Sequence, residues 1–455
     1  MNIKVPIAIL AVRGVRLVAR VLHKGGTAKP GEIALKICPD LLSHLSRGVK
    51  TVVITGTNGK TTTARMVEQV FADAGYDYIA NRSGANLISG ITTEFALKST
   101  IFGRCKSTHA VIECDEAACR RTLGQLKPEA VLITNLFRDQ VDRFGDVSVT
   151  LQSIREGLEK VPEATICINA DCPLCSSLST LPNPRIYYGL EKGAFSSAST
   201  DEGDVRRCPL CGGELKYAYR SFGHLGGWEC TSCGSKRAET QLGVREILAS
   251  TSAGSTVAIA ANGEVSTVNV NLPAVYNIYN AAGASAAAMA MGFTPEKAYA
   301  ALENFSCGFG RMETLPIGQG ARMMLVKNPT GCRQVLDFLS GLDENFDIVI
   351  CLNDKSGDGT DISWIWETDF ERLADLGEKL GKVTVSGIRW ADMALRLKYA
   401  GIDESKIACC PDYEELCDEL EKGTLPAYII PTYSAMLELR SHIVRRTGGA
   451  EFWEG

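Results

Sequence analysis

Residues 52–63, with the sequence VVITGTNGKTTT, constrain the fold of this chain more than any other stretch. A β-branched, apolar run ends at Thr55, a turn with two glycines follows, and a helical pattern begins near Lys60. A strand, a tight turn and a helix in this order present backbone N–H groups and the positive end of a helix dipole to an anion. The stretch therefore predicts a phosphate-binding loop, although Ile54 stands where the usual loop pattern has its first glycine.

The side chains of this loop suit a nucleotide triphosphate. Lys60 can reach the terminal phosphates, and Thr61 can place its hydroxyl on Mg²⁺. The predicted nucleotide contacts are Gly56, Thr57, Asn58, Gly59, Lys60, Thr61 and Thr62. The alternative is a tight strand-to-helix turn in which the lysine is incidental.

Strand-like apolar runs at 51–55, 110–113, 130–134 and 165–169 alternate with helical patterns. This alternation predicts an α/β fold with a parallel sheet and crossover helices, in which ligands bind beyond the carboxyl ends of the strands. A composition break at 196–207 and a cysteine-bearing segment indicate an insertion, after which the strand pattern resumes. After GFGRME at 308–313 the pattern changes again and predicts a second, smaller Rossmann-like α/β domain.

The length of 455 residues favours several domains. We predict an N-terminal helical segment at 1–46, a central ATP-binding domain at 47–312 with an insert at about 205–238, and a C-terminal α/β domain at 313–455. The net charge of -5 argues against a partner nucleic acid, because sequence-independent nucleic-acid binders present basic surfaces. Seventeen scattered cysteines without a secretory signal suggest a reducing, cytoplasmic compartment.

The N-terminal segment has an apolar run from Val5 to Val12, which is too short to span a membrane. Basic residues then recur at helical spacing opposite apolar ones: Arg13, Arg16 and Arg20 opposite Val15, Leu17 and Val18. The pattern favours an amphipathic helix packed on the body of the protein. A helix that lies on a membrane surface is the alternative.

The insert carries two C-x-x-C pairs separated by 18 residues: Cys208 with Cys211, and Cys230 with Cys233. Paired knuckles at this separation are typical of a zinc ribbon, in which four thiolates close a tetrahedral site. We therefore predict a structural Zn²⁺ with no open position for chemistry. A redox pair or unliganded thiols are the alternatives, and His224 between the knuckles is interpreted as a bystander.

Five further motifs follow the loop in a fixed order: VIECDE at 111–116, TNLFRDQVDRFG at 134–145, INADCP at 168–173, YNIYNAAGASAAA from Tyr276, and GRME at 310–313. Together with the loop they resemble the Mur ligase superfamily, ATP-dependent enzymes that activate a carboxylate and join it to an amine. An isolated glutamate or arginine would more often be a solvated surface residue.

This resemblance implies roles for particular residues. Glu113 and Thr61 would bind Mg²⁺, and Lys60 and Glu113 would act in catalysis. Asn277 and Asn280 would lie at the nucleotide, and Arg311 would contact a phosphate or act at a hinge. The second motif keeps Asn135, Asp139 and Asp142 but has Gln140 where histidine is common, so a second metal site stays open. Residues 327–331, KNPTG, would contact substrate or nucleotide on closure.

Residues 352–371, 386–401 and 429–437 resemble the C-terminal domain of the MurT family, ligase subunits that work with the glutaminase GatD. The resemblance implies ATP-dependent amidation of the D-glutamate α-carboxylate of the lipid II peptidoglycan stem to D-isoglutamine. The reaction would pass through an acyl phosphate, in the cytoplasm at the inner face of the membrane, within a heterodimer. The alternatives are an amino-acid-adding Mur ligase, a ligase similar to folylpolyglutamate synthase, and a zinc-ribbon protein that acts on nucleic acid.

The ammonia source must be another polypeptide, because the chain has no G-x-C-x-G nucleophile elbow and only five histidines. In the MurT family the second aspartate of the D-G-x-D motif completes the glutaminase Cys-His pair, and here it is Asp361. This residue would orient a histidine as the third member of a triad. The alternative is a loop acid that caps the helix at 364–366, and Asp358 and Asp354 are weaker candidates.

Overall fold

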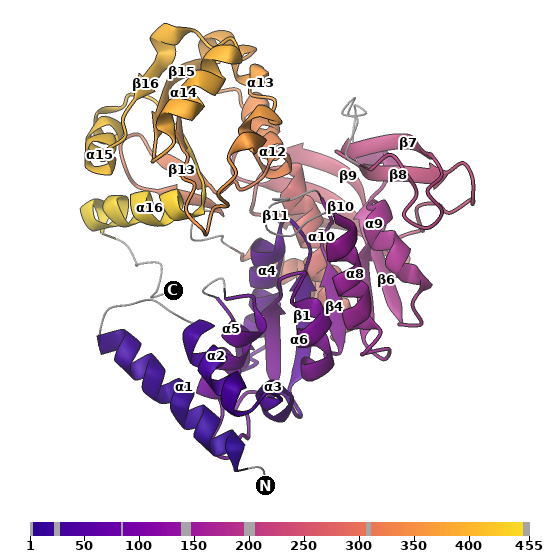
Figure 1. The fold of residues 1–455 in the computed structure, drawn as a ribbon. Helices are drawn as coiled ribbons and strands as arrows, with labels where there is room; N and C mark the ends of the chain where they lie inside the picture. Colours follow the sequence, from indigo (N-terminus) through magenta and orange to yellow (C-terminus); the bar gives the residue numbers. More distant parts are fainter. Residues whose placement is uncertain are drawn as a thin grey trace.

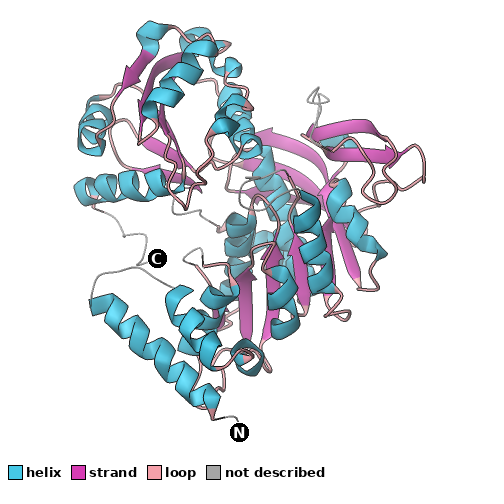
Figure 2. Ribbon diagram, in the orientation of Figure 1, coloured by secondary structure: helices cyan, strands magenta, loops and turns pink. Residues whose placement is uncertain are grey.

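The computed structural model describes residues 3–21, 28–82, 85–137, 147–194, 205–305 and 311–448. Figure 1 shows two α/β bodies, with the N-terminal helices at the outer edge of one of them. Figure 2 shows that helices cover the sheets of both bodies and that a separate two-stranded hairpin projects from the larger one. The predicted α/β class is confirmed in the described part of the chain.

The larger body is built on a nine-stranded sheet with the order β11-β10-β9-β6-β5-β4-β1-β3-β2. Its strands are β1 (Lys50–Thr55), β2 (Tyr78–Ala80), β3 (His109–Glu113), β4 (Ala130–Ile133), β5 (Thr165–Asn169), β6 (Arg185–Leu190), β9 (Leu242–Ser250), β10 (Ser255–Ala261) and β11 (Glu264–Val270). The strands from β2 to β9 pair in parallel, and β10 and β11 extend the sheet as antiparallel strands. The central strand β4 is buried along its whole length, as expected for a parallel sheet covered on both faces.

Helices cover this sheet: α4 (Lys60–Asp73), α5 (Ile88–Leu97), α6 (Cys119–Leu126), α8 (Val147–Leu158), α9 (Pro173–Ser176), α10 (Val275–Ala290) and α11 (Pro295–Glu303). The small residues from Ala281 onward lie inside α10, which begins at Val275. Gly283 explains why small residues occur in it, because a Cβ there would lie 3.1 Å from the ring of Tyr188 on β6. α10 can therefore pack closely against the sheet beside the loop that precedes α4.

Three neighbouring strands at the centre of the sheet bring the polar loops together. The strand β1 lies between β3 and β4, with Ile54 opposite Glu113 and Thr55 opposite Ile133. Because the strands are parallel, the segments that follow Thr55, Glu113 and Ile133 leave the sheet at the same edge. The topology thus brings together at one edge three segments that are separate in the sequence.

The projecting hairpin consists of β7 (Leu215–Phe222) and β8 (Leu225–Cys230) and is joined to the sheet through a buried carboxylate. Asp171, in the turn between β5 and α9, is fully buried. It accepts hydrogen bonds from Arg237 Nε at 2.6 Å, the Tyr279 hydroxyl at 2.6 Å and the Leu190 amide at 2.9 Å. Arg237 follows the hairpin and Tyr279 lies on α10, so one carboxylate ties the insert to the helix beside the phosphate loop.

The smaller body has a six-stranded sheet with the order β12-β13-β17-β14-β15-β16. Its elements are β12 (Arg311–Leu315), β13 (Ala321–Met324), β14 (Phe346–Cys351), β15 (Leu380–Ser386), β16 (Ile407–Cys409), β17 (Ala427–Pro431), α12 (Pro329–Ser340), α13 (Glu371–Ala374), α14 (Trp390–Tyr399), α15 (Tyr413–Lys422) and α16 (Tyr433–Thr447). Short 3₁₀ helices lie at 177–180, 192–194, 363–366, 377–379 and 404–406. A buried ion pair of Glu313 with Arg440, at 2.9 Å, holds β12 against α16. In the sequence, β12 is the first strand of the smaller body and comes after α11 of the larger one.

The N-terminal helices α1 (Lys4–Val21), α2 (Ala28–Ile37) and α3 (Leu41–Leu45) pack on α5 and complete the main hydrophobic core. As predicted, α1 is packed on the body, through Val5, Ala8, Ile9 and Val12. In its second half, however, the apolar side chains of Leu17 and Val18 face solvent. No helix in the described ranges combines the length and apolar character needed to cross a membrane.

A pair of helical glycines tests the packing between α2 and α5. A Cβ at Gly31 would lie 1.8 Å from the Ser89 carbonyl oxygen, whereas a Cβ at Gly14 would meet nothing within 4 Å. We predict that Gly31→Ala lowers the free energy of unfolding by about 1–3 kcal/mol, because backbone must move. Gly14→Ala should leave it unchanged or raise it by up to about 1 kcal/mol through helix propensity. Urea denaturation followed by circular dichroism measures both, and equal effects would contradict the close helix contact.

Candidate active site

The loop between β1 and α4 has the backbone shape that its glycines permit. Gly56 and Gly59 have positive φ angles of 124° and 84°. A Cβ at Gly56 would lie 2.3 Å from Thr134 Oγ1, and one at Gly59 would lie 2.1 Å from Asn280 Oδ1. Both positions therefore need glycine for conformation and for space. The loop opens at the N-terminus of α4, where Thr61 and Thr62 lie in the first turn.

Lys60 is buried beside this loop and makes an ion pair. Its Nζ lies 2.8 Å from Glu116 Oε1 and donates to the carbonyl oxygens of Gly56 and Thr57, at 2.5 and 3.3 Å. The Lys60 side chain therefore curls back under the loop, and the loop conformation and the position of the ammonium group depend on each other.

Three acids surround the Lys60 ammonium. Burial lowers the pKa of Lys60, but attraction to Glu116, and then to Glu113 and Asp115, outweighs burial and raises the pKa above its ordinary value. Burial raises the pKa of the Glu116 carboxyl, and Lys60 and Lys327 offset this only in part. Lys60 is a cation at neutral pH, and the surrounding carboxyl groups outnumber it. The cluster is suited to a further cation with oxygen ligands.

Glu113 is positioned by two asparagines. The side chain of Asn81 accepts from the Glu113 amide at 2.9 Å and donates to the Glu113 carbonyl at 2.7 Å, and Asn86 Nδ2 donates to Glu113 Oε1 at 3.4 Å. The Glu113 residue is 7% exposed, and it lies at the end of β3 beside the loop. The structure thus brings Glu113, Lys60 and the loop together, as the motifs suggested.

A chain of asparagines joins three segments at the loop. Asn58 N donates to Asn135 Oδ1 at 3.0 Å, and Asn135 Nδ2 donates back to the Asn58 carbonyl at 3.1 Å. From the smaller body, Asn328 Nδ2 donates to Asn58 Oδ1 at 3.2 Å. Asn328 also caps α12 by accepting from the Gly331 amide at 2.7 Å. Asn58 Nδ2 is buried and has no hydrogen-bond partner among the described residues, so it remains available to a ligand.

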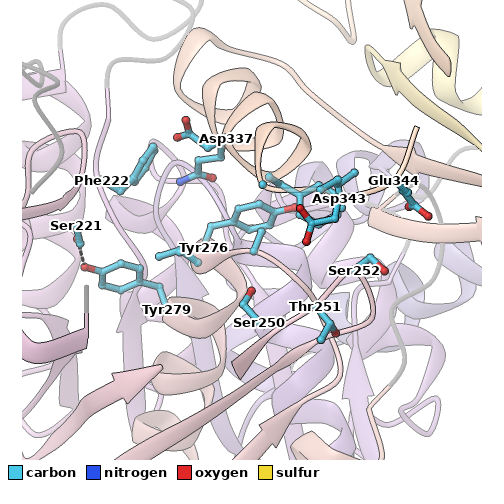
Figure 3. A pocket seen from close by; sticks show the side chains of 16 residues that line it. Ser221, Phe222, Ser250, Thr251, Ser252, Tyr276, Tyr279, Asp337, Asp343 and Glu344 are labelled. Carbon is cyan, nitrogen blue, oxygen red and sulfur yellow. Dashed lines mark hydrogen bonds between the residues drawn. The ribbon is translucent and has the colours of Figure 1, made fainter. Parts of the chain in front are cut away.

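The first turns of α10 lead from the loop to a cavity. Asn280 abuts Gly59, and its Nδ2 donates to Asn277 Oδ1 at 3.2 Å; both asparagines are buried. Beyond them lies a cavity of about 500 Å³ between the two bodies. Figure 3 shows the Tyr276 ring extending toward Asp343, and Tyr279 joined to Ser221 by a hydrogen bond. The lining residues are Ser221, Phe222, Ser250, Thr251, Ser252, Ala274, Val275, Tyr276, Tyr279, Gln334, Asp337, Phe338, Gly341, Leu342, Asp343 and Glu344.

The four cysteines of the insert converge. Their Sγ atoms all lie within 4.8 Å of one another, with Cys208 to Cys233 at 3.8 Å and Cys211 to Cys230 at 3.5 Å. Zn–S bonds of about 2.3 Å in a tetrahedron imply S···S separations of about 3.8 Å. The amides of Gly213 and Ser232 donate to two of the sulfurs at 3.4 Å. The arrangement fits a zinc ion.

Backbone donors also prepare this cluster for a metal. N–H groups of Cys233 and Ser232 lower the pKa of Cys230 to about 6, while neighbouring thiols raise the pKa of Cys211 to about 12 despite the Gly213 amide. A metal that binds would displace the remaining protons. His224 is outside the cluster: it is fully buried, with its ring centroid 4.4 Å from that of Phe137.

The acids of the D-G-x-D loop differ in their surroundings. Asp358 is buried and accepts from the Ser434 amide at 2.6 Å and the Lys355 amide at 3.1 Å, so its carboxylate shapes the loop. Asp361 is exposed, and its Oδ1 accepts from the Ser363 amide at 2.8 Å at the start of the 3₁₀ helix η3 (Ser363–Trp366). This amide is the main reason why the pKa of Asp361 lies below its usual value. Asp354 lies 3.6 Å from Arg389.

An exposed apolar patch lies on the same body as Asp361. Trp366 is 50% exposed and its ring centroid lies 5.7 Å from that of Tyr399, which is 71% exposed. Leu395, one helical turn before Tyr399, is also exposed. We call these three residues the Trp366 patch.

Several contacts were missed by sequence reasoning. Glu116, treated only as an extra acid, is the ion-pair partner of Lys60, and a charge count in VIECDE could not distinguish it from Glu113. Asn81 had no recognisable motif. Asn328 lies in KNPTG, where a helix-capping asparagine before proline was a usable signal. Asp139, Gln140 and Asp142 lie outside the described residues; Arg311 begins β12, and its side chain is outside them too.

Comparisons with known proteins agree with this geometry. Residues 54–224 match the Mur ligase middle domain and residues 325–436 match the MurT ligase C-terminal domain. Among solved structures, a pseudomurein peptide ligase type C from Methanothermus fervidus has a TM-score of 0.66 at 19% identity, over 88% of this chain and 79% of that one. MurF from Acinetobacter baumannii has a TM-score of 0.67 at 16% identity, over 91% and 80%. These structures establish a Mur ligase fold.

Full-length relatives are more specific. The chain is 35% identical to the lipid II isoglutaminyl synthase (glutamine-hydrolyzing) subunit MurT of Streptococcus pneumoniae over 98% of both chains. It is 31% identical to the protein of the same name from Staphylococcus aureus strain COL, over 96% of this chain and 97% of that one. These full-length similarities and the two domain matches show that the chain belongs to the MurT family.

Proposed function

We propose that the chain is the ligase subunit of a lipid II isoglutaminyl synthase. It would use ATP to amidate the D-glutamate α-carboxylate of the lipid II stem peptide, giving D-isoglutamine at the cytoplasmic face of the membrane. The observation that carries this proposal is the full-length similarity to MurT subunits. That similarity spans both the loop around Lys60 and the smaller body, which contacts this loop through Asn328.

ATP would lie along the loop and α10. The phosphates would meet the backbone of Gly56–Gly59, Lys60 and the hydroxyls of Thr61 and Thr62. The base would reach past Asn280 and Asn277 toward the cavity that Tyr276 lines. The unpartnered Asn58 amide supports this placement, since a bound nucleotide would give it an acceptor. Arg311 would contact a phosphate or the hinge.

Mg²⁺ would be held by Glu113 and Thr61, with Asp115 and Glu116 nearby. The donor set fits, because Glu113, Asp115 and Glu116 gather around Lys60 and the Thr61 hydroxyl lies in the adjoining first turn of α4. The ion would neutralise phosphate charge. The chain itself would hold the Lys60 ammonium beside the loop through Glu116. When ATP binds, the ammonium would exchange at least one of its loop carbonyl acceptors, on Gly56 or Thr57, for a phosphate oxygen.

The proposed reaction has two steps. A carboxylate oxygen of the substrate bonds to the γ-phosphorus, and the bond from that phosphorus to the oxygen of ADP breaks, giving an acyl phosphate. The lone pair of ammonia then bonds to the acyl carbon, the C–O bond to phosphate breaks, and one nitrogen proton passes to the departing phosphate or to water. Positioning and charge neutralisation account for most catalysis of this kind. Lys60 and Glu113 are the residues to which we assign these roles.

Lys60→Met tests the nucleotide site. We predict a loss in kcat of about 100-fold or more, the order expected when one donor to developing charge is removed. Calorimetry with a non-hydrolysable ATP analogue and Mg²⁺ should also show weaker binding. Lys50→Met, at the exposed start of β1, is the matched control and should behave as the parent. Parental turnover by Lys60→Met would refute the assignment.

We also propose a structural Zn²⁺ at Cys208, Cys211, Cys230 and Cys233. Cys211→Ser should lose the metal, measured by elemental analysis, and should make the hairpin susceptible to limited proteolysis, because such sites supply folding free energy. Cys409→Ser changes an exposed thiol in the smaller body and should keep the metal. If the parent protein, purified without chelator, contained no zinc, the proposed site would be wrong.

The ammonia would come from a GatD-like glutaminase bound to the smaller body. Asp361 is the exposed acid of its loop, whereas Asp358 is committed to the amide of Ser434. A partner whose Cys-His pair lacks an acid could receive the Asp361 carboxylate across the interface. The Trp366 patch offers aromatic surface of the kind enriched at protein interfaces.

Asp361→Asn separates the two half-reactions. Asparagine keeps an Oδ1 acceptor for the Ser363 amide, so the loop should hold its shape. In the complex with the glutaminase, we predict loss of glutamine-dependent amidation with activity on free ammonium preserved. Asp375→Asn, another exposed aspartate of the same body, is the control and should preserve both. Equal loss with glutamine and ammonium would show that Asp361 does not serve the glutaminase.

A further inference from the structure

The outward face of α1 carries an apolar stripe. Ile3 is 75% exposed, Ile7 51%, Leu10 57% and Leu17 64%, and Val18 lies beside the stripe at 57%. These positions, with the exposed Gly14, recur at steps of three and four residues, so they share one side of the helix. At 1.5 Å per residue the stripe is about 21 Å long. Figure 1 places α1 at the outer edge of the molecule.

Arg13 and Arg16 do not interrupt the stripe, because they turn toward the body. Arg13 donates to the Ser99 carbonyl oxygen. Burial raises the pKa of the Glu94 carboxyl, and Arg16 lies close enough to this carboxyl to offset part of that rise. The helix therefore buries one apolar face, uses its cations at the flank and leaves a second apolar face in water. A helix that only packed on the protein would gain nothing from this second face.

A neighbouring loop extends the apolar surface. A Cβ at Gly103 would lie 2.8 Å from Val5 Cγ1, so the turn that contains it abuts the first turn of α1. In this turn Phe102 is 62% exposed and Ile101 39%. We call the stripe, Val18 and these two residues the α1 face.

Cations outnumber acids around the α1 face, where the acids on neighbouring segments include Asp40, which acts on the Cys38 thiol together with Lys4, and Asp77, which accepts from the Ser107 hydroxyl at 2.9 Å. The sequence has no Asp or Glu from Ile3 to Lys29, while Lys4, Arg13 and Arg16 lie on α1. On the 101–106 turn, Arg104 and Lys106 are exposed. The nearest acid on α2, Glu32, stands between Lys29 and Lys36 along the sequence. Apolar surface with a cationic rim complements the interface of an anionic bilayer.

We propose that the α1 face rests on the surface of an anionic phospholipid membrane, with the α1 axis in the plane of the interface. This inference rests on the proposed function, in which the substrate is linked to a membrane lipid. Docking through α1 would keep the protein on the surface that carries that substrate. A second copy of the chain is a poorer occupant, because two-fold pairing would bring two cationic rims together.

Vesicle flotation tests the proposal with the full chain, in complex with its glutaminase subunit. The probes are vesicles of phosphatidylglycerol with phosphatidylethanolamine, and vesicles of phosphatidylcholine alone. The parent should float with the anionic vesicles, and less so at high salt. Replacing three exposed stripe residues, in I7Q/L10Q/L17Q, should reduce the membrane-bound fraction at least about tenfold.

The matched control, V149Q/L248Q/V265Q, removes three similarly exposed apolar side chains from other surfaces and should float as the parent does. Circular dichroism and thermal midpoints confirm that both variants are folded. Failure of the parent to bind anionic vesicles, or equal binding by both variants, would overturn the proposal. Light scattering that shows a dimer dissociated by the stripe variant, with vesicle binding unchanged, would assign the α1 face to a second copy.

Activity measurements separate this inference from the proposed function. The stripe variant should amidate a soluble stem-peptide substrate at the parental rate and lose turnover only on substrate in vesicles. If the parent bound vesicles but amidated neither substrate, the membrane-binding proposal would stand and the proposed reaction would be wrong. If the parent amidated both substrates without binding vesicles, the proposed reaction would stand and the membrane-binding proposal would be wrong.

Discussion

The ammonium group of Lys60 is buried at the carboxyl edge of a parallel sheet, and the surrounding architecture compensates for its charge. Its curled side chain requires free carbonyl oxygens in the loop, which in turn requires glycine at positions 56 and 59. Its charge requires Glu116, which β3 supplies because that strand lies beside β1. Removing one partner of such a buried pair is costly, since the other charge then remains without compensation. The charge of Lys60 in the loop can therefore be compensated only because the strand order places β3 beside β1.

Part of this arrangement could be predicted from the sequence. The loop at 56–62, the strand before Glu113 and the two cysteine pairs have short, local signals, because turn geometry and metal geometry restrict nearby residues. The identity of the ion-pair partner of Lys60 has no such signal: VIECDE offers three acids, and only the path of the chain after β3 selects Glu116. Asn81 and the asparagine link from Asn328 to Asn58 join segments far apart in sequence, and so they escaped residue-by-residue reasoning.

The N-terminal helix shows a second limit. Helical spacing correctly indicated an amphipathic helix, but periodicity cannot say which side faces the protein when two sides are apolar. Arg13 and Arg16 find partners on and beside α5, so Leu17 and Val18 are left in solvent. In the smaller body, likewise, the D-G-x-D motif contains two aspartates, and the sequence alone does not indicate which of them is exposed. The Ser434 amide, about 75 residues later, decides that Asp358 is internal and Asp361 is accessible.

The carboxylate of Asp171 has a consequence for the four-cysteine hairpin of this fold. Arg237 and Tyr279 both depend on it, and it is fully buried. Excising the insert would strand an anion against α10, at a cost of about 3–5 kcal/mol for an uncompensated buried charge. The hairpin therefore cannot be removed without changing residue 171 as well. Grafting it onto another ligase would require the acid and the tyrosine to be transferred with it.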